Sequence, residues 1–135
     1  MKQIILTIAG IAAALALNAG TASAQSQQKE RSAADIATEE AERLATLLDL
    51  EGWQVFYVDS TLQHDYTKLQ EELRSLQESK VGNMEIYMDA RDKWHDKVDA
   101  ALKTYLTEEQ WARYLKSGAA KLQKDRAKRA QKRMK

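Results

Sequence analysis

Apolar residues recur at gaps of three and four along most of this chain, which is the spacing of one face of an α-helix. The clearest run is Val55, Val58, Leu62, Tyr66, Leu69, Leu73 and Leu76. Such runs predict helices over about 33–48, 51–78 and 84–105, and a fourth helix that begins at Thr107. No window alternates as a strand would, and no proline interrupts the runs. We therefore predict an all-α protein with an extended four-helix protomer.

The second and third helices are long enough to form a central helical hairpin around a turn at residues 79–83. The third helix is predicted to bury Met84, Tyr87, Trp94, Val98, Ala101, Leu102 and Tyr105 in its seam. The first half of the second helix has another apolar face, formed by Trp53, Phe56 and Tyr57, which we expect to be covered as well. A hairpin with so narrow a seam leaves apolar surface uncovered, and a homodimer would bury it.

The first 24 residues have the pattern of a secretory signal peptide. Lys2 precedes an uncharged apolar run of about 14 residues, and Ala22-Ser23-Ala24 supplies the small residues of a cleavage site. The run is shorter than the roughly 20 residues that span a bilayer. We therefore expect a periplasmic protein whose mature chain begins at Gln25. An all-helical domain is expected over 25–122, and a basic C-terminal helix end or tail over 123–135.

Charge is divided unevenly along the chain. The 21 Lys and Arg nearly balance the 20 Asp and Glu, which argues against a uniformly basic nucleic-acid-binding protein. From residue 113 onward, however, ten cations are accompanied by a single acid, Asp125. The sequence also lacks cysteine, which excludes disulfides, thiolate metal sites and a cysteine nucleophile.

The basic C-terminus has two interpretations. One is a solvated, fraying helix end, because cations near a helix C-terminus are favoured by the dipole. The other is an electrostatic arm that binds anionic lipid, lipopolysaccharide, an acidic protein surface or the acidic body of another copy. It has no aromatic residues between its cations, so nucleic acid is not an expected partner. The arm comprises Lys121, Lys124, Arg126, Lys128, Arg129, Lys132 and Arg133.

A helix-start motif marks the beginning of the fourth helix. Thr107 is placed to cap that helix, while the side chain of Gln110 reaches back to the Thr107 N–H, as in a capping box. Leu106 and Trp111 have the spacing of a hydrophobic staple. The segment therefore predicts a fixed bend between the third and fourth helices.

A weaker copy of this motif precedes the second helix. Leu50 and Gln54 correspond to Leu106 and Gln110, but Glu51 stands where the other copy has threonine, and Asp49 is the expected cap. In an antiparallel hairpin both copies lie near the same end. There we expect a single aromatic cluster of Trp53, Phe56, Trp111 and Tyr114.

A signal peptide, an all-helical mature chain and two L-T-x-x-Q-like motifs around a long hairpin resemble the Spy/CpxP family of small periplasmic proteins. The resemblance is sharpest at Tyr105–Gln110 and is weaker at Leu48–Gln54. It implies a curved four-helix protomer in a cradle-shaped homodimer. It also implies an ATP-independent chaperone for partly unfolded clients, or an accessory protein that regulates an envelope sensor kinase. Some relatives bind zinc or other metals.

The residues suggest one client-binding surface. Flexible methionines and an aromatic ring beside guanidinium groups suit the binding of varied, partly unfolded chains. The candidate residues are Arg74, Met84, Tyr87, Met88 and Arg91. The alternative is that Met84, Tyr87 and Met88 only complete the packing of the hairpin or dimer.

Catalytic and metal sites have little support in the sequence. His95 shares a helix face with Asp92 and Asp99 and forms a weak candidate zinc site, although interleaved lysines indicate a solvated face instead. No nucleophile elbow, phosphate loop or paired-carboxylate pattern is present. We therefore expect no enzyme activity and no cofactor. A metal-binding sensor and a purely structural envelope protein are the remaining alternatives.

Overall fold

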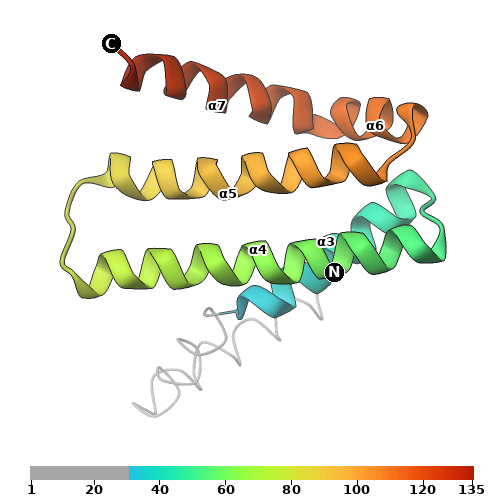
Figure 1. Cartoon of the computed structure of the whole chain (residues 1–135), viewed down its shortest axis with the longest axis horizontal. Helices are drawn as coiled ribbons and strands as arrows, with labels where there is room; N and C mark the ends of the chain where they lie inside the picture. The colour runs from blue at the N-terminus through green and yellow to red at the C-terminus, as the bar shows by residue number, and fades with distance from the viewer. Residues whose placement is uncertain (1–30) are drawn as a thin grey trace, which may run out of the picture. The chain divides into compact units, whose positions relative to one another are not determined.

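The computed structural model describes residues 31–135, so the predicted signal peptide and the start of the mature chain lie outside the described residues. The described residues form helices and no strand, which confirms the all-α class. The helices are α3 (Ala33–Leu48), α4 (Gly52–Glu78), α5 (Met84–Tyr105), α6 (Glu108–Tyr114), the π-helical segment η1 (Leu115–Ala119) and α7 (Ala120–Arg133) (Figure 1).

The predicted central hairpin is formed by α4 and α5, which pack along their length. The last turn of α4 closes with Lys80 in the left-handed region (φ 57°), where the Val81 N–H donates to the Leu76 carbonyl at 3.0 Å. Asn83 then caps α5 by accepting from the Glu85 N–H at 2.9 Å. The turn at residues 79–83 therefore lies where the sequence predicted it.

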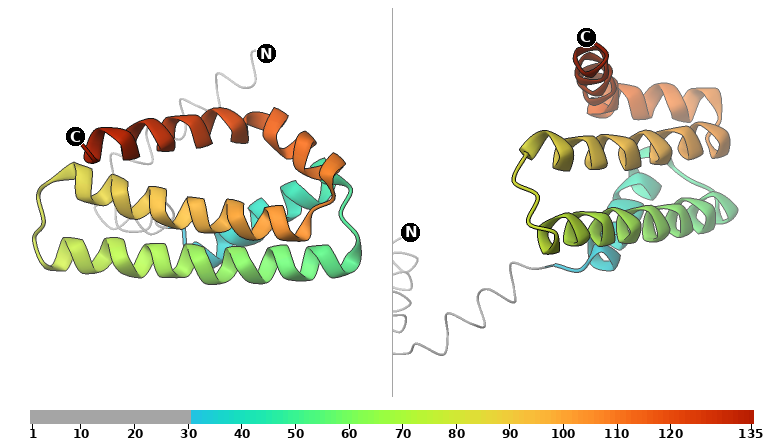
Figure 2. Two further views of the ribbon diagram at one scale, coloured as in Figure 1. Left: turned by 45° about the horizontal axis from the view of Figure 1, so that its top comes forward. Right: turned by 60° about the vertical axis from the view of Figure 1, so that its left-hand side comes forward.

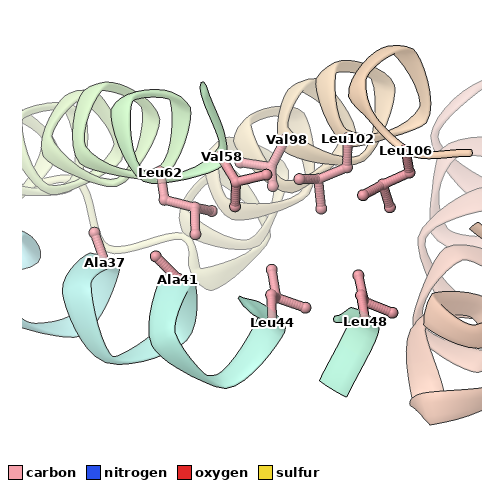
Figure 3. Packing of buried hydrophobic residues seen from close by; sticks show 9 residues of the cluster. All are labelled: Ala37, Ala41, Leu44, Leu48, Val58, Leu62, Val98, Leu102 and Leu106. Carbon is pink, nitrogen blue, oxygen red and sulfur yellow. The ribbon is translucent and has the colours of Figure 1, made fainter. Parts of the chain in front are cut away.

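α3 packs across the half of the hairpin that lies away from this turn. Its small and branched residues face Val58 and Leu62 of α4 and Val98 and Leu102 of α5, with Leu106 closing the end (Figure 3). The core is nine buried residues: Ala37, Ala41, Leu44, Leu48, Val58, Leu62, Val98, Leu102 and Leu106. Alanines on α3 allow it to approach the hairpin closely, while the leucines fill the space near its C-terminal end.

Both helix-start motifs form, and their glutamines bind each other. The Gln110 Oε1 accepts from the Thr107 N–H at 2.9 Å, and the Gln110 N–H donates to the Thr107 hydroxyl at 3.2 Å, so the predicted capping box is confirmed. At the other motif the Gln54 Oε1 accepts from the Glu51 N–H at 2.9 Å. The two amides also exchange hydrogen bonds of 2.6 and 3.1 Å.

This amide pair also reaches two backbone carbonyls at helix ends. Gln54 Nε2 donates to the Tyr105 carbonyl at 3.0 Å, and Gln110 Nε2 donates to the Leu48 carbonyl at 3.3 Å. Gln54 is only 2% exposed. The pair therefore ties the ends of α3 and α5 to the starts of α4 and α6 inside the protein.

The predicted capping role of Asp49 is wrong. Asp49 lies at the end of α3 in the left-handed region (φ 51°), and the Leu50 N–H donates back to the Ala45 carbonyl at 3.1 Å. Glu51 holds the N-cap position of α4 instead. Asp49 thus ends one helix rather than starting the next.

The predicted fourth helix is interrupted. After α6 the chain passes through η1, in which Gly118 has φ 123°, a conformation that glycine adopts far more readily than other residues. α7 then runs back beside α5, as Figures 1 and 2 show. The sequence pattern of apolar residues did not reveal this break, because the stripe of Trp111, Leu115 and Leu122 keeps a helical spacing across it.

Several apolar residues that were expected to be buried are exposed. Trp53, Phe56 and Tyr57 are 51%, 66% and 47% exposed, so the expectation that this second face of α4 is covered is wrong for the single chain. Met84 is 74% exposed and is not part of the seam. The aromatic rings also form two groups rather than one. Tyr57 contacts Trp53, Phe56 and Tyr105, whereas Trp111 contacts Tyr114.

Loss of the amide pair should destabilise the fold. We expect Gln54→Ala and Gln110→Ala each to lower the free energy of unfolding by about 2 kcal/mol, because buried partners lose their hydrogen bonds. Urea unfolding followed by circular dichroism measures the effect, with exposed Gln77→Ala as the control. In the double variant the losses should couple by at least about 0.5 kcal/mol. Strictly additive losses would contradict a direct interaction between the amides.

Gly118→Ala should be destabilising although an added methyl group has room. A Cβ would meet no atom within 4 Å at Gly118, Gly52 or Gly82, and Gly118 alone of these three has a positive φ. We expect a loss of about 1–2 kcal/mol from backbone strain at Gly118. Gly52→Ala, at the start of α4, is the control and should be neutral or slightly stabilising. If the two substitutions changed thermal unfolding equally, backbone strain at position 118 would not be the cause.

Candidate functional site

The basic C-terminus is a helix that lies against the chain's own α5. Of the two forms expected for residues 123–135, the structure shows the helix, which continues to Arg133. Three arginines of the predicted arm bind aspartates of α5 in antiparallel order. The pairs are Arg126 with Asp96 (2.6 Å) and Asp99, Arg129 with Asp92 (2.8 and 2.9 Å), and Arg133 with Asp89 (2.7 Å).

These ion pairs are shielded from solvent to different degrees. Arg126 is 8% exposed and Asp92 is 4% exposed, so both are buried between the two helices. α7 itself brings few apolar side chains to this contact. Charge pairing and charge-assisted hydrogen bonds therefore hold α7 in place more than hydrophobic burial does.

The face proposed for zinc is covered by α7. Asp92 accepts two hydrogen bonds from Arg129, and Asp99 accepts from the Tyr114 hydroxyl at 2.6 Å and from the Gln123 amide at 3.0 Å. The interpretation of this face as solvated is wrong for Asp92. Within residues 31–135, no three His, Asp or Glu side chains are grouped as metal ligands would be.

A cavity of about 180 Å³ lies where α3, α5 and the start of α7 meet. His95 lines it beside Tyr66, with ring centroids 6.0 Å apart. Burial lowers the pKa of His95, with a further contribution from Arg126, and this favours the neutral imidazole. Burial also raises the pKa of the Tyr66 hydroxyl to about 12. The Ser117 hydroxyl in the wall donates to the Tyr114 carbonyl, so it is directed toward the backbone.

Within residues 31–135, the turn end of the hairpin lacks the cover that α3 gives to the other end. α3 begins at Ala33, beside Gln63, whose amide donates to the Ala34 carbonyl and to the Thr38 hydroxyl. Beyond this point the seam residues Leu69 and Leu73 are only partly buried. They line a groove of about 300 Å³ together with Ala33, Ile36, Tyr66, Gln70, Arg91 and His95.

The predicted client-binding residues are divided between two surroundings. Met84, Met88 and Arg91 recur at helical spacing on one face of α5, and Arg91 lines the groove. Met84 and Met88 are 74% and 42% exposed. Tyr87 lies partly buried in the hairpin, and its hydroxyl donates to the Val81 carbonyl at 2.6 Å.

Arg74 is exposed on α4 and lines neither this groove nor the cavity beside His95. We define the open-end surface as the groove residues Ile36, Leu69, Leu73 and Arg91 together with Met84 and Met88, which continue the Arg91 face of α5. Met88 also lines a second groove, of about 290 Å³, with Asp89 of α5 and Arg129 of α7. Sequence reasoning missed Leu69 and Leu73 because it placed them in the continuous apolar run of the second helix, and it did not single out Ile36. The length of α3 relative to α4 is the signal that could have identified them, since a shorter helix cannot cover the whole hairpin.

A second apolar patch lies at the opposite end of α4. Trp53, Phe56 and Tyr57 are exposed together, and the Trp53 Nε1 donates to Glu51 at 2.9 Å. Tyr57 stacks on Tyr105 with ring centroids 5.3 Å apart, which fixes one edge of the patch. This patch is separate from the open-end surface along the helix.

No helix within residues 31–135 is long and apolar enough to cross a membrane. Comparison of the chain with protein-family models, with curated proteins and with solved structures finds no match. The resemblance to the Spy/CpxP family therefore stays a prediction from the motifs and the order of helices.

Acid should release α7 before the rest of the fold. Hydrogen bonds from Arg129 hold the pKa of Asp92 below its usual range. The pair therefore stabilises docked α7 above the ordinary aspartate pKa, and this contribution is lost as the pH falls through the lower, folded-state pKa. Below about pH 4, the heteronuclear NOE values of residues 120–133 should fall before those of α4. A simultaneous fall would contradict independent release.

The same release should occur at neutral pH in Asp92→Asn, because Arg129 then lies beside a neutral amide in a partly buried contact. Glu78→Gln removes the same charge at an exposed position and should leave α7 docked. Amide hydrogen exchange in α7 measures both variants. An Asp92→Asn variant with parent-like protection of α7 would show that the Asp92–Arg129 pair is not needed to hold the helix.

Proposed function

We propose that this protein is a periplasmic, ATP-independent chaperone or envelope-stress accessory protein that binds partly unfolded clients, as its resemblance to the Spy/CpxP family implies. The observation that carries the proposal is the open-end surface. It combines partly buried leucines and the Arg91 guanidinium in one groove, and the exposed Met84 and Met88 lie on the same face of α5 as Arg91.

The chemistry of this surface suits clients without a fixed shape. Methionine side chains are flexible and adapt to different apolar partners. The groove is open to solvent on one side and is lined by residues of α3, α4 and α5. Affinity would come from apolar contact, while Arg91 and neighbouring charges would accelerate capture in a salt-dependent way.

A homodimer is part of the same proposal. The patch of Trp53, Phe56 and Tyr57 provides exposed aromatic surface away from the open-end surface, and aromatic residues are enriched at protein interfaces. Pairing through this patch would leave the open-end surface of each copy available to clients.

Regulation of an envelope sensor kinase is the alternative from the same resemblance. It depends on the basic C-terminus, of which Arg126, Arg129 and Arg133 are engaged by α5. Removal of residues 121–135 would therefore expose the aspartates of α5 as well as remove a binding arm. Deletion of this segment is a poor test of that alternative.

The chaperone proposal predicts that Met84→Ser together with Met88→Ser weakens protection of clients. Full burial of a methionine side chain contributes about 1.5–3 kcal/mol, and a client without a fixed shape buries only part of each one. We therefore expect a combined loss of about 1.4 kcal/mol, so that about tenfold more protein is needed for half-maximal protection. The measurement is light scattering of an unfolded protein diluted into buffer without ATP, in the presence of stoichiometric amounts of the chain.

The matched control is Ile86→Ser together with Met134→Ser. These residues are 41% and 88% exposed, close to the 42% and 74% of Met88 and Met84, but they lie on other faces. The control variant should protect as well as the parent. If the parent gives no protection at any salt concentration, the chaperone proposal fails. Equal weakening by both variants would exclude the open-end surface as the client site.

A further inference from the structure

The cations of α7 are sorted by type between its two faces. The arginines at positions 126, 129 and 133 point toward α5, where they bind aspartates. The lysines of the helix and its end lie on the other side and are exposed: Lys121, Lys124, Lys128, Lys132 and Lys135. Their spacing of three and four residues places them in one row along the helix.

This row of lysines, here called the lysine face, is almost free of acids. The only acidic residue of α7 is Asp125, which lies 3.5 Å from Lys121. α7 also forms an outer edge of the folded helices, with α5 on one side of it (Figures 1 and 2). Most of the lysine face is therefore directed away from α5, and only its Lys132 also borders a groove with Glu85 and Asp89 of that helix.

We propose that the lysine face binds the protein to the surface of an anionic phospholipid bilayer. Lysine is a compact, hydrated charge on a flexible stem, and it binds phosphate without fixed geometry, whereas arginine suits directed, bidentate pairs. The phosphates of a fluid lipid bilayer have no fixed positions, so they suit a cation that binds without fixed geometry. Clusters of four to eight cations on a helix are typical of electrostatic binding to anionic lipid.

The apolar content of α7 indicates contact at the surface of the bilayer rather than insertion. Beside the lysines lie Ala120, Ala127 and Met134, and Leu115 lines a hollow with Lys121 and Lys124. Leu122 is exposed on the opposite side of α7, and α7 has no aromatic residue to anchor it in the interface. A specific protein partner would be expected to meet an aromatic or arginine anchor in a pocket, and the lysine face offers neither. Charge complementarity alone therefore identifies the partner, and binding is strongly salt-dependent.

The arginines that bind α5 position the lysine face. Because they hold α7 along α5, the lysine face is presented on an ordered helix, and the positive charge of the arginines is compensated within the chain. This role is independent of client binding at the open-end surface. Failure of one proposal leaves the other unchanged.

The test compares two triple variants with equal loss of charge. Lys124, Lys128 and Lys132 are changed to Gln in one, and the exposed Lys68, Lys80 and Lys103 in the other. Both are made in a chain that begins at Gln25, which keeps the compact unit Ala33–Lys135 and removes the apolar N-terminal run. Sedimentation with phosphatidylglycerol vesicles measures binding, and phosphatidylcholine vesicles are the neutral comparison.

The parent should bind the anionic vesicles, dissociate from them near 0.5 M salt and not bind the neutral ones. The lysine-face variant should have a partition coefficient about 100-fold lower, since each lysine contributes about fivefold. The control variant should bind like the parent. Absence of parental binding, equal weakening by both variants, or binding to polyglutamate in preference to the anionic vesicles would each overturn the proposal. Circular dichroism checks that both variants keep the parental fold.

Discussion

The pairing of two glutamine amides at one end of the hairpin is the interaction on which the rest of the fold depends. Gln54 and Gln110 are 56 positions apart in the sequence, yet each donates to the other and to a carbonyl at the end of a neighbouring helix. An amide has both donors and acceptors, so two of them can satisfy each other and still reach the backbone. This fixes where α3 and α5 end relative to the starts of α4 and α6.

One consequence is that the two ends of the hairpin differ. Near the amide pair, α3 and α6 surround the seam and nine residues are packed in a core. Toward the turn, α3 is absent and apolar residues of the same two helices are partly exposed. The same repeat of leucines therefore serves as core in one half of α4 and as surface in the other. Within α4, the half near the amide pair therefore contributes to the stable core, and the half near the turn contributes adaptable apolar surface.

The sequence predicted the helices well because periodicity and capping are local. The bounds of α3, α4 and α5, the turn at residues 79–83 and the capping box of Thr107 all follow from nearby residues. It did not reveal the docking of α7, since the arginines and aspartates that meet lie 27 to 44 positions apart. Asp92 has the same local sequence whether it is solvated or buried. The bend between α5 and α6, followed by the kink at Gly118, brings α7 beside α5 and decides between these outcomes (Figure 1).

The candidate surfaces were predicted in part for the same reason. Met84, Met88 and Arg91 were identified from their chemistry, and they share a face of α5. Which of the seam leucines accompany them depends on where α3 begins to cross the hairpin, and this is a property of packing. The exposure of Trp53, Phe56 and Tyr57 likewise reflects packing, since none of the helices in the described part of the chain covers this face.

The division of arginine and lysine between the two faces of α7 has a consequence for the comparison of related sequences. Exchange of arginine for lysine leaves length, net charge and helix propensity nearly unchanged, and it is usually regarded as conservative. In this helix the two residues have different partners, so an exchange at position 126 or 129 would remove a bond that holds the helix, whereas one at position 124 or 128 would not. Relatives that keep the total charge but shuffle the two residue types would be expected to differ in how their last helix is attached.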